Sequence, residues 1–466
     1  MRRTKIICTI GPKTASFEAL STLTSLGMDI ARLNMSHGDY EWHSQVIRAI
    51  KTINGKGNAS VGILLDTKGP EIRSGDLKKD LVIEKGDTFI FTIDKALGDE
   101  KSVEISYDGF VKEAKVGDII LIDSGMMTFE VKAIEGKNIV TICLDGGTLT
   151  SRRHVNIQGK SAKLPTITKK DWEDIKFGIE QGVDFIALSF VKEAKAIKDL
   201  KKYIQKVKAH VDVIAKIESA SAIPNLDAII KASDGVMVAR GDLGAELPLE
   251  EVPLIQEDIV AKSLQFGKPV IIATHLLESM IENPTPTRAE VADIAESVRE
   301  RADAMMLSAE TATGEYPFKA LEVMATVAKR IEKKVMENKG IPVLATSDPR
   351  IELSRSASIM ANNLDAKAII VFTRRGFMAA NVSRCRPGSP IFAFTNMTSI
   401  RRRLNLYWGV TAFRIQFSND PEKTIQRALE LLRGKKLLKK DERIILVSDI
   451  LAGKEFVETI QIRKIG

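Results

Sequence analysis

The chain has 466 residues, of which 44% are hydrophobic and 28% are charged. This length is too great for one compact core, so we expect two or three domains, and the composition is that of a globular protein. The net charge of +8 would suit a nucleic-acid partner, but basic residues are spread along the whole chain and aromatic residues make up only 5%. We therefore disfavour nucleic-acid binding and attribute the basic bias to small anionic substrates.

The cysteines and the apolar segments indicate the compartment. Cys8, Cys143 and Cys385 are far apart in the sequence and form no paired metal-ligand spacing, which fits a reducing cytoplasm. The apolar stretch near the N-terminus is broken at Gly11 and Pro12, too early for a signal peptide. No apolar run approaches the roughly 20 residues of a membrane span. We expect a cytoplasmic protein with no membrane partner.

The first quarter of the chain predicts β-strands and helices in alternation. Apolar, β-branched strands are predicted at residues 5–10, 29–35 and 61–67, and a helix is predicted to begin after Ser16 as its N-cap and to end at Gly27. The pattern then changes. From residue 71 to 164, short alternating segments are separated by Gly-Asp, Glu-Gly and Asp-Gly turns, which predicts a small all-β unit.

The strand–helix alternation resumes after Pro165. Five further strands are predicted, each followed by a helical stretch, at residues 184–190, 213–218, 235–240, 270–275 and 304–307. Three strands before the insertion and five after it make one (β/α)8 TIM barrel, interrupted by the β unit. An insertion at a connection between a strand and its helix lies above the active-site face of such a barrel, so the β unit is a candidate lid.

A third unit follows the barrel from about Ile341. Its predicted strands alternate with helices, which favours a C-terminal α/β domain with a largely parallel sheet; they lie at residues 368–373, 390–395, 409–414 and 443–447. The predicted domain organisation is residues 1–70 for the first part of the barrel, 71–165 for the inserted lid, 166–340 for the second part of the barrel, and 341–466 for a C-terminal regulatory domain.

Almost every predicted barrel strand ends in charged or hydroxyl-bearing side chains. A buried unpaired charge costs several kcal/mol, so a shared active site at the C-terminal rim explains them better than packing does. For Asn34 and Ser36, simple turn formation remains the alternative. The strand-end residues are Arg32, Asn34, Ser36, Asp66, Thr67, Lys216, Glu218, Arg240, Asp242, Thr274, Ser308 and Glu310.

Two of these carboxylates indicate a metal. Glu218 and Asp242 are hard oxygen donors suited to Mg²⁺, which typically takes one or two carboxylates together with phosphates and water. Lys216 lies two residues before Glu218, so strand alternation places both side chains on one face. Such a lysine is suited to hold a phosphoryl group, although a solvated ion pair with Glu218 is the alternative. Gly241 and Gly244 leave backbone N–H groups near Asp242 open to an anion.

These residues resemble the pyruvate kinase family, whose signature segments occur in this chain in the same order and cover the barrel almost completely. The insertion and the C-terminal unit match in position and length. The segments are TKIICTIGP (4–12), RLNMSHG (32–38), LLDTKGPEIR (64–73), IAKIES (214–219), VMVARGDLG (236–244), GKPVIIATHLLESM (267–280), PTRAEV (286–291) and MMLSAETATGEYP (305–317).

The resemblance implies phosphoryl transfer from phosphoenolpyruvate to ADP, followed by protonation of the enol to pyruvate. It implies that Glu218 and Asp242 hold Mg²⁺ or Mn²⁺, and that K⁺ is a second cofactor. It assigns catalytic roles to Lys216, Arg32, Arg73, Thr274, Ser308 and Glu310; substrate binding to Arg32, Lys216, Gly241, Asp242 and Thr274; nucleotide binding to Asn34, Arg73 and Arg153; and the K⁺ site to Asn34, Ser36, Asp66 and Thr67.

The chain departs from the family pattern at several positions. Met35 stands where phenylalanine is usual and is expected to point to the core, His275 replaces a glutamine, and Arg153 replaces a lysine. The family's C-terminal phosphate loop, Thr-x-Ser-Gly, here lacks its serine at residues 373–376. We therefore expect a phosphorylated effector other than fructose 1,6-bisphosphate, such as a nucleoside or sugar monophosphate.

The resemblance also bears on the assembly and the activity of the protein. By the resemblance, the protein is a homotetramer. One alternative is a catalytically weak relative that binds phosphorylated metabolites as a regulator. The intact residues Lys216, Glu218 and Asp242 argue against that alternative.

Overall fold

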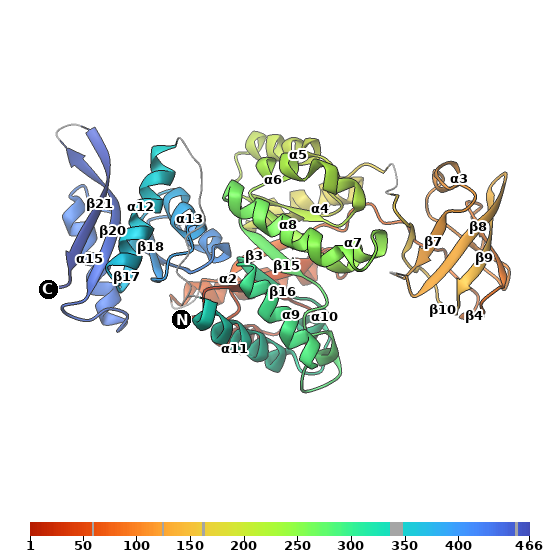
Figure 1. The fold of residues 1–466 in the computed structure, drawn as a ribbon, viewed down its shortest axis with the longest axis horizontal. Coiled ribbons are helices and arrows are strands. Elements are labelled where there is room, and N and C mark those ends of the chain that lie inside the picture. The colour runs from red at the N-terminus through yellow and green to blue at the C-terminus, as the bar shows by residue number, and fades with distance from the viewer. Residues whose placement is uncertain (58–59, 124, 161–163, 336–347, 453–454) are drawn as a thin grey trace.

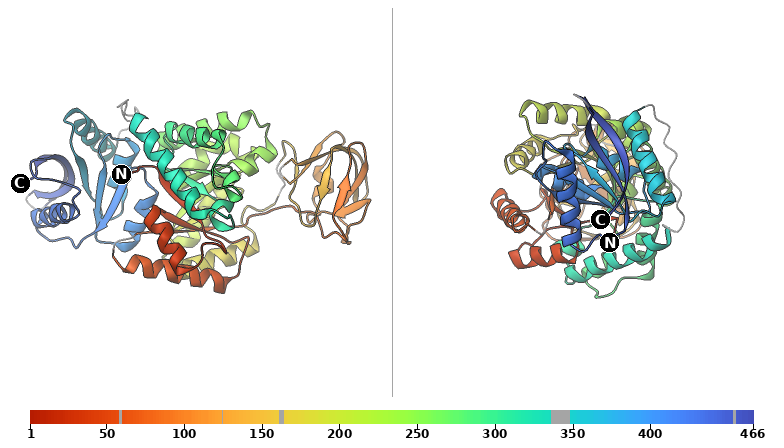
Figure 2. Two further views of the ribbon diagram at one scale, coloured as in Figure 1. Left: turned by 90° about the horizontal axis from the view of Figure 1, so that it is seen from below. Right: turned by 90° about the vertical axis from the view of Figure 1, so that its left-hand side faces the viewer.

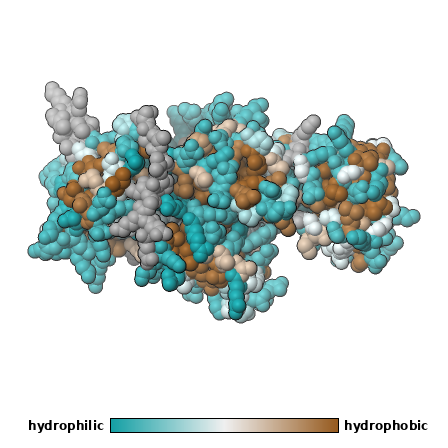
Figure 3. Space-filling model, in the orientation of Figure 1, coloured by the Kyte–Doolittle hydropathy of each residue, from teal (hydrophilic) through white to brown (hydrophobic). Residues whose placement is uncertain are grey.

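The structure is a computed structural model that describes residues 1–57, 60–123, 125–160, 164–335, 348–452 and 455–466. Three units lie in a row (Figure 1), with the barrel in the middle, the β unit at one end and the C-terminal α/β unit at the other. The predicted boundary between residues 340 and 341 lies outside the described residues. No helix of the described residues is long and apolar enough to cross a membrane, and Figure 3 shows hydrophilic residues over much of all three units.

The central unit is a closed parallel barrel, which confirms the predicted TIM barrel. The strand order is β1-β16-β15-β14-β13-β12-β3-β2. Buried apolar side chains such as Ile7, Leu64 and Phe185 fill its interior, as in a packed core rather than a pore. The strands are β1 (Lys5–Thr9), β2 (Ile30–Asn34), β3 (Gly62–Asp66), β12 (Phe185–Leu188), β13 (Asp212–Ile217), β14 (Gly235–Ala239), β15 (Val270–Ala273) and β16 (Ala304–Leu307).

Amphipathic helices cover the outside of the barrel. The first has the two predicted caps: the Ser16 side chain accepts a hydrogen bond from the backbone of Ala19, and Gly27 is left-handed with φ 111°. The helices around the outside of the barrel are α1 (Phe17–Leu26), α2 (Tyr40–Gly55), α4 (Lys169–Glu180), α5 (Ala194–Lys206), α6 (Leu226–Ala232), α8 (Glu251–Phe266), α9 (Arg288–Arg299) and α11 (Pro317–Val335). Short helices at the rim are η1 (Ala220–Asn225), α7 (Arg240–Glu246), η2 (Glu278–Ile281) and α10 (Ala309–Ala312).

The inserted unit is all-β apart from one helical turn, as predicted. A six-stranded sheet in the order β11-β7-β8-β9-β5-β6 and a small β10-β4 sheet enclose a core in which the rings of Phe89, Phe91 and Phe129 contact one another. Figure 2 shows this unit set apart from the barrel. Its elements are β4 (Leu81–Ile83), β5 (Thr88–Thr92), β6 (Ser102–Glu104), α3 (Phe110–Glu113), β7 (Ile119–Ile122), β8 (Met127–Glu135), β9 (Asn138–Asp145), β10 (Gly147–Leu149) and β11 (Val155–Ile157).

The C-terminal unit has a five-stranded sheet in the order β19-β18-β17-β20-β21. Four strands are parallel, as predicted, and β21 pairs antiparallel with β20. The elements are α12 (Pro349–Asn363), β17 (Ala368–Phe372), α13 (Phe377–Arg384), β18 (Ile391–Thr395), α14 (Thr398–Arg403), η3 (Leu404–Leu406), β19 (Val410–Arg414), α15 (Pro421–Gly434), β20 (Arg443–Ala452) and β21 (Glu455–Lys464).

The C-terminal unit covers the N-terminal end of the barrel. Arg402 forms an ion pair at 2.9 Å with Asp184, just before β12, and Arg386 forms one at 2.7 Å with Asp303, just before β16. Because this end of the barrel is covered, the C-terminal ends of the strands form the open rim on the side of the β unit.

Candidate active site

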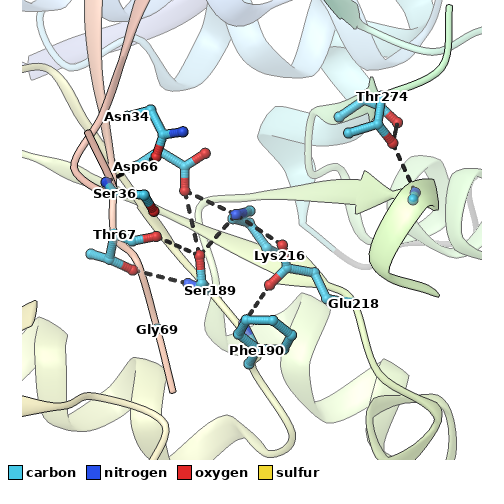
Figure 4. Close-up of polar contacts among 12 residues, drawn as sticks. Asn34, Ser36, Asp66, Thr67, Gly69, Ser189, Phe190, Lys216, Glu218 and Thr274 are labelled. Atoms are coloured by element: carbon cyan, nitrogen blue, oxygen red, sulfur yellow. Dashed lines mark hydrogen bonds and ion pairs between the residues drawn. The ribbon is translucent and has the colours of Figure 1, made fainter. Parts of the chain in front are cut away.

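Lys216 is the centre of a charged cluster at the rim. Its ammonium lies 3.0 Å from Asp66 Oδ1 and 2.8 Å from Glu218 Oε1, and it donates a hydrogen bond of 2.8 Å to Ser189 Oγ (Figure 4). Burial by itself disfavours the charged ammonium, but Asp66 and Glu218 outweigh it and raise the pKa of Lys216 above its usual value. Lys216 therefore stays positively charged at neutral pH.

Asp66 joins this lysine to a second cation. The fully buried Asp66 carboxylate accepts a hydrogen bond of 2.6 Å from Arg32 Nε, and Arg32 also donates to the hydroxyl of Thr9. Burial opposes ionisation of Asp66, but Lys216 and Arg32 lower its pKa below the usual value. Two fixed cations, one from β13 and one from β2, are thus held beside each other at the rim.

Glu218 and Asp242 form the carboxylate pair of the site. Burial raises the pKa of each group, and their mutual repulsion adds to the rise for Glu218. Glu218 Oε2 also accepts a hydrogen bond of 2.6 Å from the backbone of Phe190. The described residues contain no group of three or more His, Cys, Asp or Glu side chains able to hold a metal. Two carboxylates, completed by substrate oxygens and water, fit Mg²⁺ rather than a metal held by the protein alone.

Thr274 lies apart from the Lys216 cluster (Figure 4) and contacts the segment that carries Asp242. Its hydroxyl accepts a hydrogen bond of 2.9 Å from the backbone of Gly241. Thr274 and His275 have positive φ angles of 67° and 55°, a conformation that costs free energy in residues other than glycine. Arg240 donates a hydrogen bond of 2.6 Å to the Thr274 carbonyl and so stabilises it. Such strain is typical of a functional position.

Ser308 and Glu310 follow β16 and contact each other. One oxygen of Glu310 accepts a hydrogen bond of 2.6 Å from the Ser308 backbone, and the other accepts one from the backbone of Leu277. Burial raises the pKa of Glu310. The buried hydroxyl of Ser308 has no hydrogen-bond partner among the described residues.

The oxygens predicted to bind K⁺ lie close together (Figure 4). The Asn34 side-chain oxygen accepts a hydrogen bond of 3.1 Å from the Ser36 backbone, as the turn alternative predicts. The Thr67 hydroxyl accepts one of 3.1 Å from the Ser189 backbone. The bond between Asn34 and Ser36 stabilises a turn, and the bond between Thr67 and Ser189 links the segment after β3 to the segment after β12.

The remaining predicted residues lie on the inserted β unit and on its connection to the barrel. Arg73 forms a 2.7 Å ion pair with Glu71, and Arg153 forms a 3.0 Å ion pair with Asp123. The predicted nucleotide-binding residues are therefore divided between two units, because Asn34 belongs to the barrel rim.

Two residues of the rim cluster were missed from the sequence, Ser189 and Phe190. Ser189 contacts Lys216 and donates a hydrogen bond of 2.7 Å to the Thr67 carbonyl. Phe190 has a positive φ of 49° and presents its backbone N–H to Glu218. The available signal was a hydroxyl residue at the C-terminal end of a predicted barrel strand, residues 184–190, the same signal that identified Thr274.

Two comparisons with family models cover most of the chain. Residues 1–321 match the model described as "Pyruvate kinase, barrel domain", and residues 352–463 match "Pyruvate kinase, alpha/beta domain". The chain belongs to the pyruvate kinase family. It transfers the phosphoryl group of phosphoenolpyruvate to ADP and forms pyruvate and ATP, as the resemblance of the sequence motifs implied.

Similar proteins agree over the full length. The chain is 49% identical over 471 residues to "Pyruvate kinase isozyme G, chloroplastic" of Nicotiana tabacum, covering 100% of this chain and 84% of that protein. It is 41% identical to a pyruvate kinase of Bacillus licheniformis, covering 92% of this chain and 75% of that protein. A crystal structure of a pyruvate kinase from Cryptosporidium parvum superposes with a TM-score of 0.92 at 34% identity, covering 100% of this chain and 96% of the other.

Proposed function

We propose that Lys216 and Arg32 stabilise the phosphoryl group during its transfer, and that Glu218 and Asp242 hold the Mg²⁺ or Mn²⁺ ion. The observation that carries this proposal is the buried ammonium of Lys216, 2.8 Å from Glu218 and 3.0 Å from Asp66. A phosphoryl group in transfer spreads negative charge over its equatorial oxygens, so its barrier falls mainly through positioning and positive charge. The metal, when bound, supplies a further positive charge to those oxygens. Loss of transfer in Lys216→Met tests the assignment.

The second half of the reaction protonates the enol. We assign Thr274 and the backbone of Gly241 to the binding of the substrate, together with Asp242. Ser308 and Glu310 are assigned to a proton path through water. Two observations support this role: Glu310 accepts a hydrogen bond from the Ser308 backbone, and burial raises the pKa of the Glu310 carboxyl, which favours its protonated form.

We assign ADP binding to Asn34 on the barrel and to Arg73 and Arg153 on the inserted unit. A nucleotide held by both units requires them to approach each other, so residues 71–165 act as a lid. The barrel is then formed by residues 1–70 and 166–340, and residues 341–466 form the regulatory domain. The separation of the β unit from the barrel in Figure 2 supports this organisation.

K⁺ is the proposed monovalent cofactor, held by Asn34, Ser36, Asp66 and Thr67. Replacing K⁺ by a bulky organic cation at constant ionic strength is expected to reduce turnover by more than about tenfold. Without the cation, Asp66 and Glu71 repel the anionic substrate, by a few kcal/mol at an effective dielectric constant of about 20. Glu71→Lys should restore part of the activity without K⁺, because its ammonium replaces the ion. Undiminished turnover of the unmodified enzyme without K⁺, Na⁺ or NH₄⁺ contradicts the assignment.

A phosphorylated effector is the proposed ligand of a cavity in the C-terminal unit. The cavity has a volume of about 590 Å³, and Arg350, Arg374 and Arg375 line it. The Thr373 hydroxyl accepts a hydrogen bond from the Gly376 backbone and so begins a loop typical of phosphate binding. The arginines supply the positive charge that a phosphate needs.

The absence of a hydroxyl-rich loop leads to a prediction about the effector. A nucleoside or sugar monophosphate should lower the KM for phosphoenolpyruvate, and fructose 1,6-bisphosphate should have little effect. Arg375→Ser should abolish the response, whereas Arg355→Ser, on α12 but outside the cavity, should preserve it. Strong activation by the bisphosphate that is lost in Arg375→Ser would show the prediction to be wrong.

Assembly and location are also proposals. A homotetramer is expected by membership of the family, and sedimentation velocity of the purified protein tests it. The cytoplasmic location is supported by the cysteines, since Cys8, Cys143 and Cys385 are all free and buried and none is used for a disulfide.

A further inference from the structure

One carboxylate contacts both connections between the barrel and the inserted unit. Asp171 lies in the first turn of α4 and is 0% exposed. Its Oδ1 accepts a hydrogen bond of 3.0 Å from the backbone N–H of Gly69, on the connection that leaves the barrel. Its Oδ2 accepts bonds of 2.8 and 2.6 Å from the backbone and hydroxyl of Thr168, on the connection that returns.

Helix capping explains only half of this arrangement. Thr168 and Asp171 form a capping box at the start of α4, and Thr287 and Glu290 form another at the start of α9, so the Thr168 bonds alone are ordinary. The bond to Gly69 joins residues 102 positions apart. This bond does not cap the helix. Through Asp171 it links the connection that leaves the barrel to the connection that returns to it.

Gly69 in turn lies directly against Ser189 and Phe190 of the rim cluster. Its φ is 75°, and a Cβ added there would lie 2.8 Å from both Ser189 Cβ and Phe190 Cδ2. Those two residues contact the reacting groups: Ser189 accepts the hydrogen bond from Lys216, and Phe190 donates one to Glu218. Gly69 appears beside this cluster in Figure 4. The connection therefore passes between Asp171 and the residues that hold the phosphoryl-binding lysine, with no room for a side chain.

We propose that Asp171 is a positioning residue that ties both connections of the β unit to α4 and thereby sets the orientation in which the unit receives ADP. The proposal rests on the lid function assigned to residues 71–165. An ionised carboxylate suits the role because it accepts hydrogen bonds at both oxygens. Asparagine has one acceptor oxygen, so Asp171→Asn can accept from only one of the two backbone N–H groups, that of Gly69 or that of Thr168.

The experiment measures the orientation of the lid and the binding of each substrate in the full-length enzyme. Spin labels are attached to cysteines introduced by Val116→Cys on the lid, where the side chain is 67% exposed, and by Lys202→Cys on α5, where it is 79% exposed. The native cysteines are buried. The width of the distance distribution between the labels then reports the freedom of the lid.

The matched control is Thr168→Val, which removes the hydroxyl of the capping box and keeps the bond between Asp171 and Gly69. Asp171→Asn is expected to broaden the distance distribution and to raise the KM for ADP by about tenfold, because small displacements of binding groups have large effects. The KM for phosphoenolpyruvate should change less than the KM for ADP, since its assigned ligands lie on the barrel. Thr168→Val should match the unmodified protein in all three measurements.

An unchanged distribution in Asp171→Asn, or equal broadening in Thr168→Val, overturns the proposal. If the distance distribution broadens but the KM for ADP does not change, Asp171 does hold the two connections together. The role of the lid in ADP binding is then refuted. If Asp171→Asn does not fold, Asp171→Glu provides the same test: it keeps both acceptor oxygens but displaces them, and the same broadening is expected.

Discussion

Lys216→Met is expected to reduce the rate of phosphoryl transfer by about 10² to 10³-fold or more, while the fold and Mg²⁺ binding persist. The change removes the ammonium that we assign to the transferring group and keeps a side chain of similar length. Arg32 remains bound to Asp66, so one of the two carboxylates beside Lys216 stays paired. The measurement is pyruvate formation coupled to lactate dehydrogenase, with circular dichroism to verify folding.

A second lysine variant separates the loss of this ammonium from a general effect of charge. Lys201→Met removes a lysine on α5 that pairs with Asp234 at 2.7 Å, away from the rim, and should keep normal turnover. If a well-folded Lys216→Met enzyme were fully active, Lys216 would have no part in the mechanism.

Glu218→Gln and Asp242→Asn are each expected to raise the Mg²⁺ concentration required for half-maximal activity by about tenfold or more, because each removes a charged oxygen ligand. A titration of turnover against Mg²⁺ measures the change. Asp227→Asn, which alters a carboxylate paired with Lys262 on the outside of the barrel, is the matched control. If both rim variants give the titration of the unmodified enzyme, the metal site lies elsewhere.

The same carboxylates predict a pH dependence. Burial raises the pKa of Glu218 and Asp242, so protons compete with the metal up to a higher pH than for an exposed carboxyl group. Metal ligands must be deprotonated. The Mg²⁺ requirement of the unmodified enzyme should therefore fall as the pH rises from mildly acidic to mildly alkaline values.

The barrel was predictable because its strands have a strong signal. Each is a continuous apolar, β-branched run, as expected for a parallel strand that is covered on both faces, and β12 (Phe185–Leu188) and β13 (Asp212–Ile217) lie within a few residues of the predicted ranges. The three-residue strands of the insertion, such as β4 and β11, are too short to show alternation. The strand β21 was missed because it lies at the edge of its sheet and pairs with β20 alone, so charged residues occupy much of it.

The grouping of side chains around Lys216 was predictable where strand geometry alone fixes it. Parallel strands bring their ends to one rim, and alternation puts Lys216 and Glu218 on one face. The contacts of Ser189, the left-handed conformation of Thr274 and the bond between Asp171 and Gly69 were not predictable in this way. Each depends on segments that are distant in the sequence and meet only in the folded barrel.

The most direct test of the central claim is an assay of the purified chain in which phosphoenolpyruvate, ADP, Mg²⁺ and K⁺ are each left out in turn. The account predicts that pyruvate and ATP form in equal amounts when all four are present, and that omission of any one reduces pyruvate formation by at least about tenfold, because each is assigned a charge or a reacting group at the rim. Binding of phosphoenolpyruvate without any pyruvate formation in the complete mixture would contradict it, and would identify the chain as a regulator that binds phosphorylated metabolites.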